Sequence, residues 1–478
     1  MTTVTESTLT EVRSPSDDGL VGTVQRATPE AIDEAVEAAR VAGAAWARTP
    51  RHRRYELMNR FAAALAQESD ALATVLARES GKTKSETVGE VALCGRLFRG
   101  FAERMMATTD EARFLDTQAG SERDVAVTKA EPLGVVVSII PFNFPVELFA
   151  HKVAPAIAMG NTVVVKAPEE DPLAVQRLGE IIKEVGFPDH VVTVLHGEGD
   201  VGARLVAHPD VKAVSLTGST ETGLIVAREG AKTLKRVFLE LGSNDPMIVL
   251  EDADIEAAVD AALFGRSIAN GQCCCATKRL LVHDAVADAF TAALQRGVEG
   301  LSVGDPLHAG TDIGPLISER AAQRVGEQVA EAVSEGARLL TGGSRDRAFF
   351  APTILTDVPA TSGVAGGVEI FGPVLPIVRF SDQDEAVEIA NRSPYGLSGS
   401  VFSSDVRRAW GLAEQLDTGQ VVINGSGLYR SERLGFGGFK LSGNAREGLD
   451  TTLNDYVRHK DIVLPGFSSA IDVMEAAR

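Results

Sequence analysis

Three adjacent cysteines, Cys273, Cys274 and Cys275, are the first residues of this sequence whose types and spacing could do chemistry. They lie in the stretch ANGQCCCATKR, in a chain with only four cysteines. Neighbouring cysteines form a disulfide only with severe strain. A tetrahedral metal site needs further Cys or His ligands at matching spacing, and the sequence has none, so no metal is expected. One nucleophilic thiol between two small packing residues fits better, although inert buried thiols fit the local pattern equally well.

The composition narrows the classes of protein and of partner. The 478 residues are enough for two or three domains, and 44% of them are hydrophobic. The net charge of −19 argues against binding to nucleic acid or an anionic membrane. The polar N-terminus lacks the apolar core of a signal peptide, and no run of about 18 apolar residues would span a membrane. With so few cysteines, these features predict a cytoplasmic protein.

Helices and strands must position any reactive thiol. Residues 28–105 show helical periodicity, and Thr28 with Pro29 forms a helix-start signal. From residue 133, five apolar strands alternate with helices, a pattern that predicts a parallel sheet. These strands are LGVVVSII, TVVVKA, HVVTVL, VKAVSLTG and KRVFLEL. Ligands bind beyond the carboxyl ends of such strands. The polar residues at or after these ends are Asn143, Lys166, His196, Thr217 and Glu240.

A second α/β region is expected after the first, with PMIVL, RLLVHD, EIFGPVLPIVRF and GQVVINGSG as strand-bearing segments. Two strand-like stretches, residues 123–130 and 456–464, belong to neither core. Because exposed strand edges must be covered, we expect these stretches to pair across subunits. Cys94 recurs with apolar residues at helical spacing and is interpreted as a core residue.

Three segments are candidates for binding a nucleotide cofactor. In LTGSTETG, a strand ends at Thr217, the chain turns at Gly218, and Ser219 caps a helix whose free N–H groups would attract phosphate. Lys166 and Glu169 follow another strand and suit the hydroxyls of a ribose. A carboxylate there would repel a 2′-phosphate, which favours NAD over NADP. The GEGDVG loop has glycine-rich spacing but lacks the acid expected after the next strand. Each segment also has an alternative without a cofactor. LTGSTETG could be a plain capped helix, Lys166 and Glu169 could be solvated charges on a loop, and GEGDVG could be a tight turn.

Six motifs in a fixed order widen the context. They are PFNFP at 141, LTGSTETG at 216, LELGSNDP at 239, GQCCCATKR at 271, EIFGPV at 369 and GFGGFKLSG at 435. This order resembles the aldehyde dehydrogenase superfamily over nearly the whole chain. The resemblance implies an α/β fold with a Rossmann-type parallel-sheet cofactor domain, a second α/β catalytic domain and a small β oligomerisation arm. The implied bounds are 1–112 and 131–242 for NAD binding, 243–441 for catalysis, and 113–130 and 442–478 for oligomerisation strands and the C-terminal tail.

The resemblance also implies roles for the residues of the reaction. Cys274 matches the nucleophile, which attacks the aldehyde carbon. Asn143 matches the side-chain donor of the oxyanion hole, and Glu240 the base that activates water to cleave a thioester. Lys152 and Glu447 match a proton-relaying pair. The implied product is a carboxylic acid, formed with NAD or, less favoured, NADP as acceptor.

Further positions match the family's binding residues. Lys166 and Glu169 match contacts to the adenosine ribose. The positions expected at the pyrophosphate are Thr217, Gly218 and Ser219. Glu369 and Phe371 match contacts to the nicotinamide ribose. His151, Phe144, Arg430 and Phe436 are expected to line the substrate tunnel. Within the family, the sequence is more similar to the lactaldehyde and phosphonoacetaldehyde dehydrogenase branches. A small polar or anionic aldehyde is therefore expected as substrate, bound with the help of Arg430. The alternative is that the arginines of this loop are solvated at a subunit edge and bind no substrate. The implied assembly is a homodimer or homotetramer.

One departure from the family pattern lies close to the expected site. Ser243 replaces the second glycine of the usual leucine-glycine-glycine sequence, and its side chain could crowd the nicotinamide. Two alternative functions therefore stay open: acylation of coenzyme A, which the presence of Glu240 argues against, and a catalytically weakened paralogue that serves as a binding or structural protein.

Overall fold

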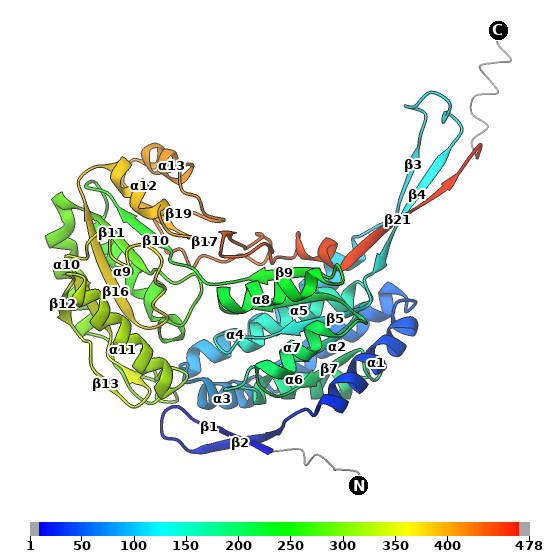
Figure 1. The fold of residues 1–478 in the computed structure, drawn as a ribbon, viewed down its shortest axis with the longest axis horizontal. Coiled ribbons are helices and arrows are strands. Elements are labelled where there is room, and N and C mark those ends of the chain that lie inside the picture. Colours follow the sequence, from blue (N-terminus) through cyan, green and yellow to red (C-terminus); the bar gives the residue numbers. More distant parts are fainter. Residues whose placement is uncertain (1–8, 468–478) are drawn as a thin grey trace.

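The computed structural model describes residues 9–467, which form two lobes and a long arm (Figure 1). Residues 1–8 and 468–478, the ends of the predicted N-terminal and C-terminal segments, lie outside this range. A short hairpin of β1 (Leu9–Arg13) and β2 (Leu20–Gln25) begins the described chain. No helix among the described residues is both long and apolar enough to cross a membrane.

The predicted helical region is confirmed. Its four helices are α1 (Pro29–Trp46), α2 (Arg51–Gln67), α3 (Ser69–Ser80) and α4 (Lys84–Met106). Thr28 caps α1 by accepting the N–H of Ala31, with Pro29 at the first helical position, as predicted. Cys94 on α4 is fully buried in the apolar core, as predicted.

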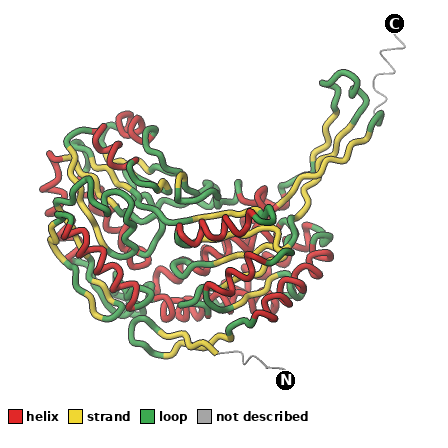
Figure 2. Tube along the Cα trace, in the orientation of Figure 1, coloured by secondary structure: helices red, strands yellow, loops and turns green. Residues whose placement is uncertain are grey.

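The five predicted strands form one parallel sheet, in the order β7 (Val192–Leu195), β6 (Thr162–Lys166), β5 (Val135–Ile139), β8 (Val211–Thr217) and β9 (Arg236–Glu240). Successive side chains of a strand point to opposite faces. Accordingly, Val135 and Val137 pack in a core with α1, α7 (Gly199–Ala207) and α8 (Thr220–Ala231), whereas Val136 packs in a core with α2, α4, α5 (Pro145–Ala158) and α6 (Leu173–Glu184). Helices therefore cover both faces (Figure 2).

The second lobe contains a seven-stranded sheet, in the order β12 (Arg338–Thr341), β15 (Thr353–Thr356), β16 (Val374–Phe380), β11 (Arg279–His283), β10 (Pro246–Val249), β18 (Ser400–Phe402) and β19 (Val422–Ile423). All neighbours are parallel except β12 and β15. Its helices are α9 (Ile255–Ser267), α10 (Asp284–Glu299), α11 (Glu319–Ser334), α12 (Gln383–Asn391) and α13 (Val406–Ala413). The predicted second α/β region is confirmed.

The two strand-like stretches pair with each other in the arm, and their predicted pairing across subunits stays a prediction. β4 (Val125–Pro132) lies between β3 (Glu111–Phe114) and β21 (Val457–Leu464), and both pairs are antiparallel (Figure 1). The two strand-like stretches thus pair with each other within one chain, over eight residues. The sequence pattern shows that an edge needs a partner but not which strand supplies it.

Candidate active site

The middle cysteine lies in a small apolar cluster that joins the two lobes. Cys274 packs there with Cys273 and Cys275, with Phe144 from the loop after β5, and with Phe436 from the loop that follows β19. The structure therefore brings together the predicted nucleophile and two of the predicted substrate-lining residues. Cys273 and Cys275 are buried, whereas Cys274 is partly exposed. Of the three cysteines, the predicted nucleophile is the residue with the most exposed surface.

The three thiols have different surroundings. The sulfurs of Cys273 and Cys275 are 3.6 Å apart, and all three sulfurs lie within 4.8 Å of one another. Interaction with Cys273 acts to lower the pKa of the Cys274 thiol, but interaction with Cys275 and burial outweigh it and raise that pKa well above the usual range. Because only the thiolate attacks a carbonyl, Cys274 needs a nearby positive charge to react at neutral pH.

The segment before the cysteines has an unusual backbone. Ala269 and Asn270 have φ values of 49° and 57°, which non-glycine residues rarely adopt. The N–H of Ala269 donates to Glu86 on α4 (2.8 Å), and the Asn270 side chain donates to the carbonyls of Gly81 (2.9 Å) and Pro315 (2.8 Å). Strain of this kind persists where several contacts hold it. The cysteine loop is thereby tied to the start of α4.

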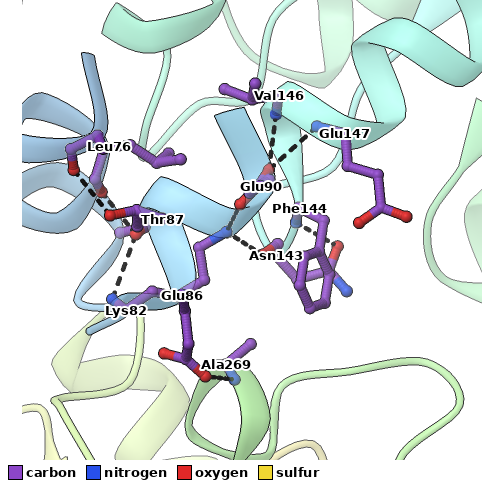
Figure 3. Close-up of polar contacts among 12 residues, drawn as sticks. Leu76, Lys82, Glu86, Thr87, Glu90, Asn143, Phe144, Val146, Glu147 and Ala269 are labelled. Carbon is purple, nitrogen blue, oxygen red and sulfur yellow. Dashed lines mark hydrogen bonds and ion pairs between the residues drawn. The ribbon is translucent and has the colours of Figure 1, made fainter. Parts of the chain in front are cut away.

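Asn143 is held from the same part of α4 (Figure 3). Its amide oxygen accepts the N–H of Phe144 (3.1 Å), which leaves the amide nitrogen as the donor. Its backbone carbonyl accepts a hydrogen bond from the Lys82 ammonium (2.7 Å), which also pairs with Glu90. Glu90 in turn accepts the N–H of Val146 (2.9 Å) and of the next residue at the start of α5. One buried ion pair thus fixes the loop that carries the predicted oxyanion-hole donor.

Replacing Lys82 with methionine is expected to lower the free energy of unfolding by about 3–5 kcal/mol, because Glu90 is left as an unpaired buried charge. The matched control is Lys84→Met, which removes a half-exposed pair with Asp70 (3.0 Å) and is expected to cost less than about 1 kcal/mol. Urea unfolding of both variants measures the difference. Equal midpoints for the two variants would contradict the role of this ion pair.

A second group of predicted residues surrounds a small cavity of about 10 Å³. His151, Lys152, Glu240 and Glu447 line it, and it has room for about one water molecule. Lys152 and Glu447 form a buried ion pair (2.7 Å). Glu240 is buried, and neither of its carboxylate oxygens has a partner among the described residues. Burial and the nearby Glu447 raise the pKa of Glu240 well above its usual range, and Lys152 opposes them. A buried carboxyl group with a raised pKa beside space for a water is suited to general-base chemistry.

The predicted substrate residues His151 and Arg430 also meet. Their side-chain nitrogens are 3.5 Å apart, and the Arg430 guanidinium stacks on the Phe436 ring at 3.7 Å. Glu147 lies 3.9 Å from Arg430 and 3.7 Å from His151. The alternative for Arg430 is a solvated position at a subunit edge. Its side chain is only 27% exposed, which disfavours this alternative. A half-buried guanidinium with these long contacts has donors left for an anionic ligand.

The predicted cofactor residues lie at the carboxyl edge of the five-stranded sheet. Lys166, the last residue of β6, pairs with Glu169 (3.0 Å). Ser219 caps α8 by accepting the N–H of Thr222 (3.2 Å). The Thr217 hydroxyl, at the end of β8, is buried and has no partner among the described residues. An orphaned hydroxyl beside a free helix N-terminus fits a phosphate group, and the Lys166–Glu169 pair fits ribose hydroxyls. By contrast, the GEGDVG segment mainly begins α7.

Glu369 and Phe371, predicted to face the nicotinamide ribose, lie next to the cysteine loop. The Phe371 ring meets Phe142 edge-on, with centroids 5.9 Å apart. Glu369 accepts the N–H of Ser243 (3.1 Å) and pairs with Lys278 (2.7 Å). The Ser243 side chain is buried and donates to the carbonyl of Cys274. Its hydroxyl is therefore engaged with the protein, and the effect of Ser243 on the nicotinamide site stays a prediction.

Comparison with known proteins agrees with this geometry. The sequence model of the aldehyde dehydrogenase family matches residues 2–462. The chain belongs to the aldehyde dehydrogenase family. The predicted family, fold class and activity, oxidation of an aldehyde with NAD or NADP as acceptor, are therefore confirmed.

Two relatives and one solved structure illustrate the match. The glutarate-semialdehyde dehydrogenase of Pseudomonas aeruginosa is 37% identical over 464 residues, covering 95% of this chain and 94% of the relative. The succinate-semialdehyde dehydrogenase [NADP(+)] of Escherichia coli is 36% identical over 455 residues, covering 94% and 93%. The betaine aldehyde dehydrogenase of Staphylococcus aureus, solved in complex with NAD+, has a TM-score of 0.92 at 32% identity, covering 97% and 92%.

Sequence reasoning missed three residues of this aldehyde dehydrogenase site: Lys82, Glu90 and Lys278. Glu90 follows Glu86 by four residues, so both lie on one face of α4. This spacing could have indicated that the two carboxylates face the same site. Lys278 directly precedes the buried strand β11, and a lysine beside such a strand was a second signal. Neither signal says which partner the charge meets, because those partners lie far away in the sequence.

Proposed function

We propose that this protein oxidises a small anionic aldehyde to the free carboxylic acid, with Cys274 as the nucleophile and NAD as the preferred acceptor. The observation that carries the substrate class is Arg430. Its half-buried guanidinium stacks on Phe436 in the apolar cluster around Cys274, and its nearest carboxylate is 3.9 Å away. A carboxylate at the far end of the aldehyde would satisfy these donors bidentately. The relatives include glutarate-semialdehyde and succinate-semialdehyde dehydrogenases, whose named substrates are aldehydes of this kind.

The residues divide the reaction into two steps. The Cys274 thiolate bonds to the aldehyde carbon, and the Asn143 amide together with the Cys274 N–H stabilises the charge that develops on oxygen. A nicotinamide cofactor, if held by the residues at the carboxyl edge of the five-stranded sheet, would supply the hydride acceptor; loss of hydride from that carbon would leave a thioester on Cys274. Glu240 then takes a proton from water, which attacks the thioester and releases the acid and the thiol. The Lys152–Glu447 pair beside Glu240 carries the proton away.

Two features support the acceptor and the product. The Glu169 carboxylate pairs with Lys166 where the adenosine ribose is expected, and it would repel the 2′-phosphate of NADP. The relatives include enzymes for both cofactors, so the preference rests on Glu169. Glu240 lies beside a cavity of the size of a water, which favours hydrolysis over transfer to coenzyme A.

The arm supports a homodimer or homotetramer. β3 and β21 are the outer strands of the arm, and their outer edges pair with no other strand among residues 9–467. Phe114 is 63% exposed, and Ile462, Val463 and Leu464 are also exposed. Apolar side chains along an open edge favour a second copy of the chain as the partner. The four free thiols agree with a reducing, cytoplasmic location.

The substrate proposal predicts a selective loss in Arg430→Ala. With an ω-carboxylated aldehyde, kcat/KM is expected to fall about 10-fold to 100-fold, because a charge-assisted bond contributes about 1.5–3 kcal/mol. With a neutral aldehyde of equal length, kcat/KM should change little. Absorbance at 340 nm, with NAD and with NADP, follows the reaction.

The matched control is Arg433→Ala, on the same loop. Arg433 is 74% exposed and pairs with Asp450 (3.3 Å), so its loss removes the same charge without changing the tunnel. Equal losses for both variants, or an unchanged ratio between the two aldehydes in Arg430→Ala, would refute an anionic substrate held by Arg430.

A further inference from the structure

The ammonium group of Lys278 lies at the backbone carbonyl of the proposed nucleophile, Cys274. The Lys278 side chain is 1% exposed. The ammonium donates to the backbone carbonyl of Cys274 and to the hydroxyl of Ser243 (2.9 Å), and that hydroxyl donates to the same carbonyl. Two donors from different segments thus hold one carbonyl, that of the residue whose thiol is expected to react. Ser243 and Lys278 form a bridge between the loop after β9 and the cysteine loop.

The charge of Lys278 is balanced by Glu369. The ammonium and a carboxylate oxygen of Glu369 are 2.7 Å apart, and the Glu369 side chain is 20% exposed. Asp245 is buried close by, and burial raises its pKa to about 7 although Lys278 opposes this shift. Glu369 and Asp245 together raise the pKa of Lys278 although burial acts to lower it, so the lysine stays charged.

The thiol also meets groups from other elements. Cys273 and Cys275 flank it, and Arg430, from the loop after β19, lies near enough to act on the charge of Cys274. Arg266 on α9 acts on Cys273 and donates to the carbonyls of Val374 and Ile370. Of these cations, Lys278 is the one that donates a hydrogen bond to Cys274, at its backbone carbonyl.

We propose that Lys278 is a positioning residue that supports the thiolate of Cys274, and that Glu369 is the counter-ion that limits this support. The inference rests on the proposed role of Cys274 as nucleophile. At an effective dielectric constant of about 20, charges a few ångströms apart interact strongly enough to move a titration by one or more pH units. Removing the cation therefore disfavours the thiolate, and neutralising its counter-ion favours it. The two substitutions should therefore shift the pKa of the Cys274 thiol in opposite directions. A purely structural role of Lys278 and Glu369 would not require opposite shifts.

The test measures alkylation of Cys274 by iodoacetamide in the protein without cofactor. Rates are followed between pH 6 and about pH 11, so that the range extends well above the usual pKa of a thiol, and peptide mass spectrometry assigns the modified cysteine. In Lys278→Met the pH midpoint is expected to rise by about one unit. The rate at pH 8 should fall about threefold, because a more basic thiolate is also more nucleophilic and offsets part of the tenfold loss. In Glu369→Gln the midpoint should fall and the rate at pH 8 should rise.

Lys278→Arg keeps the charge and should restore the wild-type midpoint to within about 0.3 unit, well inside the one-unit shift expected for loss of the charge. Midpoints that stay at the wild-type value in both Lys278→Met and Glu369→Gln, or that move in the same direction, would overturn the proposal. If Lys278→Met does not fold, a midpoint in Glu369→Gln that does not fall overturns it. Alkylation needs no NADH formation, so a failure of the proposed catalytic role of Cys274 appears only in the 340 nm assay.

Discussion

Replacing Cys274 with alanine is expected to reduce NADH formation by about a thousandfold or more. The reason is that the bond between sulfur and the aldehyde carbon, which precedes hydride loss, can no longer form. Cys274 is also the most exposed residue of the three neighbouring cysteines, in a cluster with Phe144 and Phe436. Steady-state rates with NAD and a saturating aldehyde measure the loss.

The two neighbours provide the controls. Cys273→Ala and Cys275→Ala remove buried thiols of the same size and are expected to keep at least about a tenth of the activity, since they change packing and not the reacting atom. Retained activity in Cys274→Ala, or an equally large loss in Cys273→Ala, would show that the nucleophile is wrongly assigned.

Replacing Glu240 with glutamine is expected to separate the two chemical steps. A first turnover should still form about one NADH per active site, because hydride transfer does not use this carboxylate. Steady-state turnover should then fall about 100-fold to 10,000-fold, because the thioester is no longer hydrolysed with the help of a base. Rapid mixing with absorbance detection at 340 nm distinguishes the burst from the later phase.

The pH dependence of the wild type provides a second readout of Glu240. A base acts only when it is deprotonated, and burial and Glu447 raise the pKa of this carboxyl group well above its usual range. Turnover limited by thioester hydrolysis should therefore rise with pH at values well above the usual pKa of a carboxyl group, and the glutamine variant should lose this rise. A variant that loses the burst as well as the turnover would place Glu240 in the first step.

The matched variant Glu447→Gln tests the pair behind the base. Because Lys152 lies 2.7 Å from Glu447, losing that carboxylate leaves an unpaired buried ammonium near Glu240. That positive charge would lower the pKa of Glu240, so the rise of turnover with pH should move to lower pH. In Glu240→Gln, by contrast, the rise with pH should disappear. The two variants therefore distinguish the base itself from a residue that only changes the pKa of the base.

The sequence by itself determined the α/β class, the five parallel strands, the helix start at Thr28 and the ordered motifs that identify the family. These features follow from local rules: hydrophobic periodicity reports the secondary structure, and a cap or a motif needs only a few consecutive residues. Local reasoning also placed Asn143, Lys166, Thr217 and Glu240 near one edge of the sheet, because all parallel strands end there.

Only the tertiary structure decided which charges meet. Lys82 and Asn143 are 61 residues apart, and Lys152 and Glu447 are 295 residues apart. The pairing of β4 with β21 likewise joins distant segments. A lysine looks the same in sequence whether it is solvated or buried against a carboxylate, and its electrostatic effect depends on distance and burial. The positions of the candidate reacting groups could therefore be proposed from the sequence, whereas the charged residues that contact them became visible only in the folded protein.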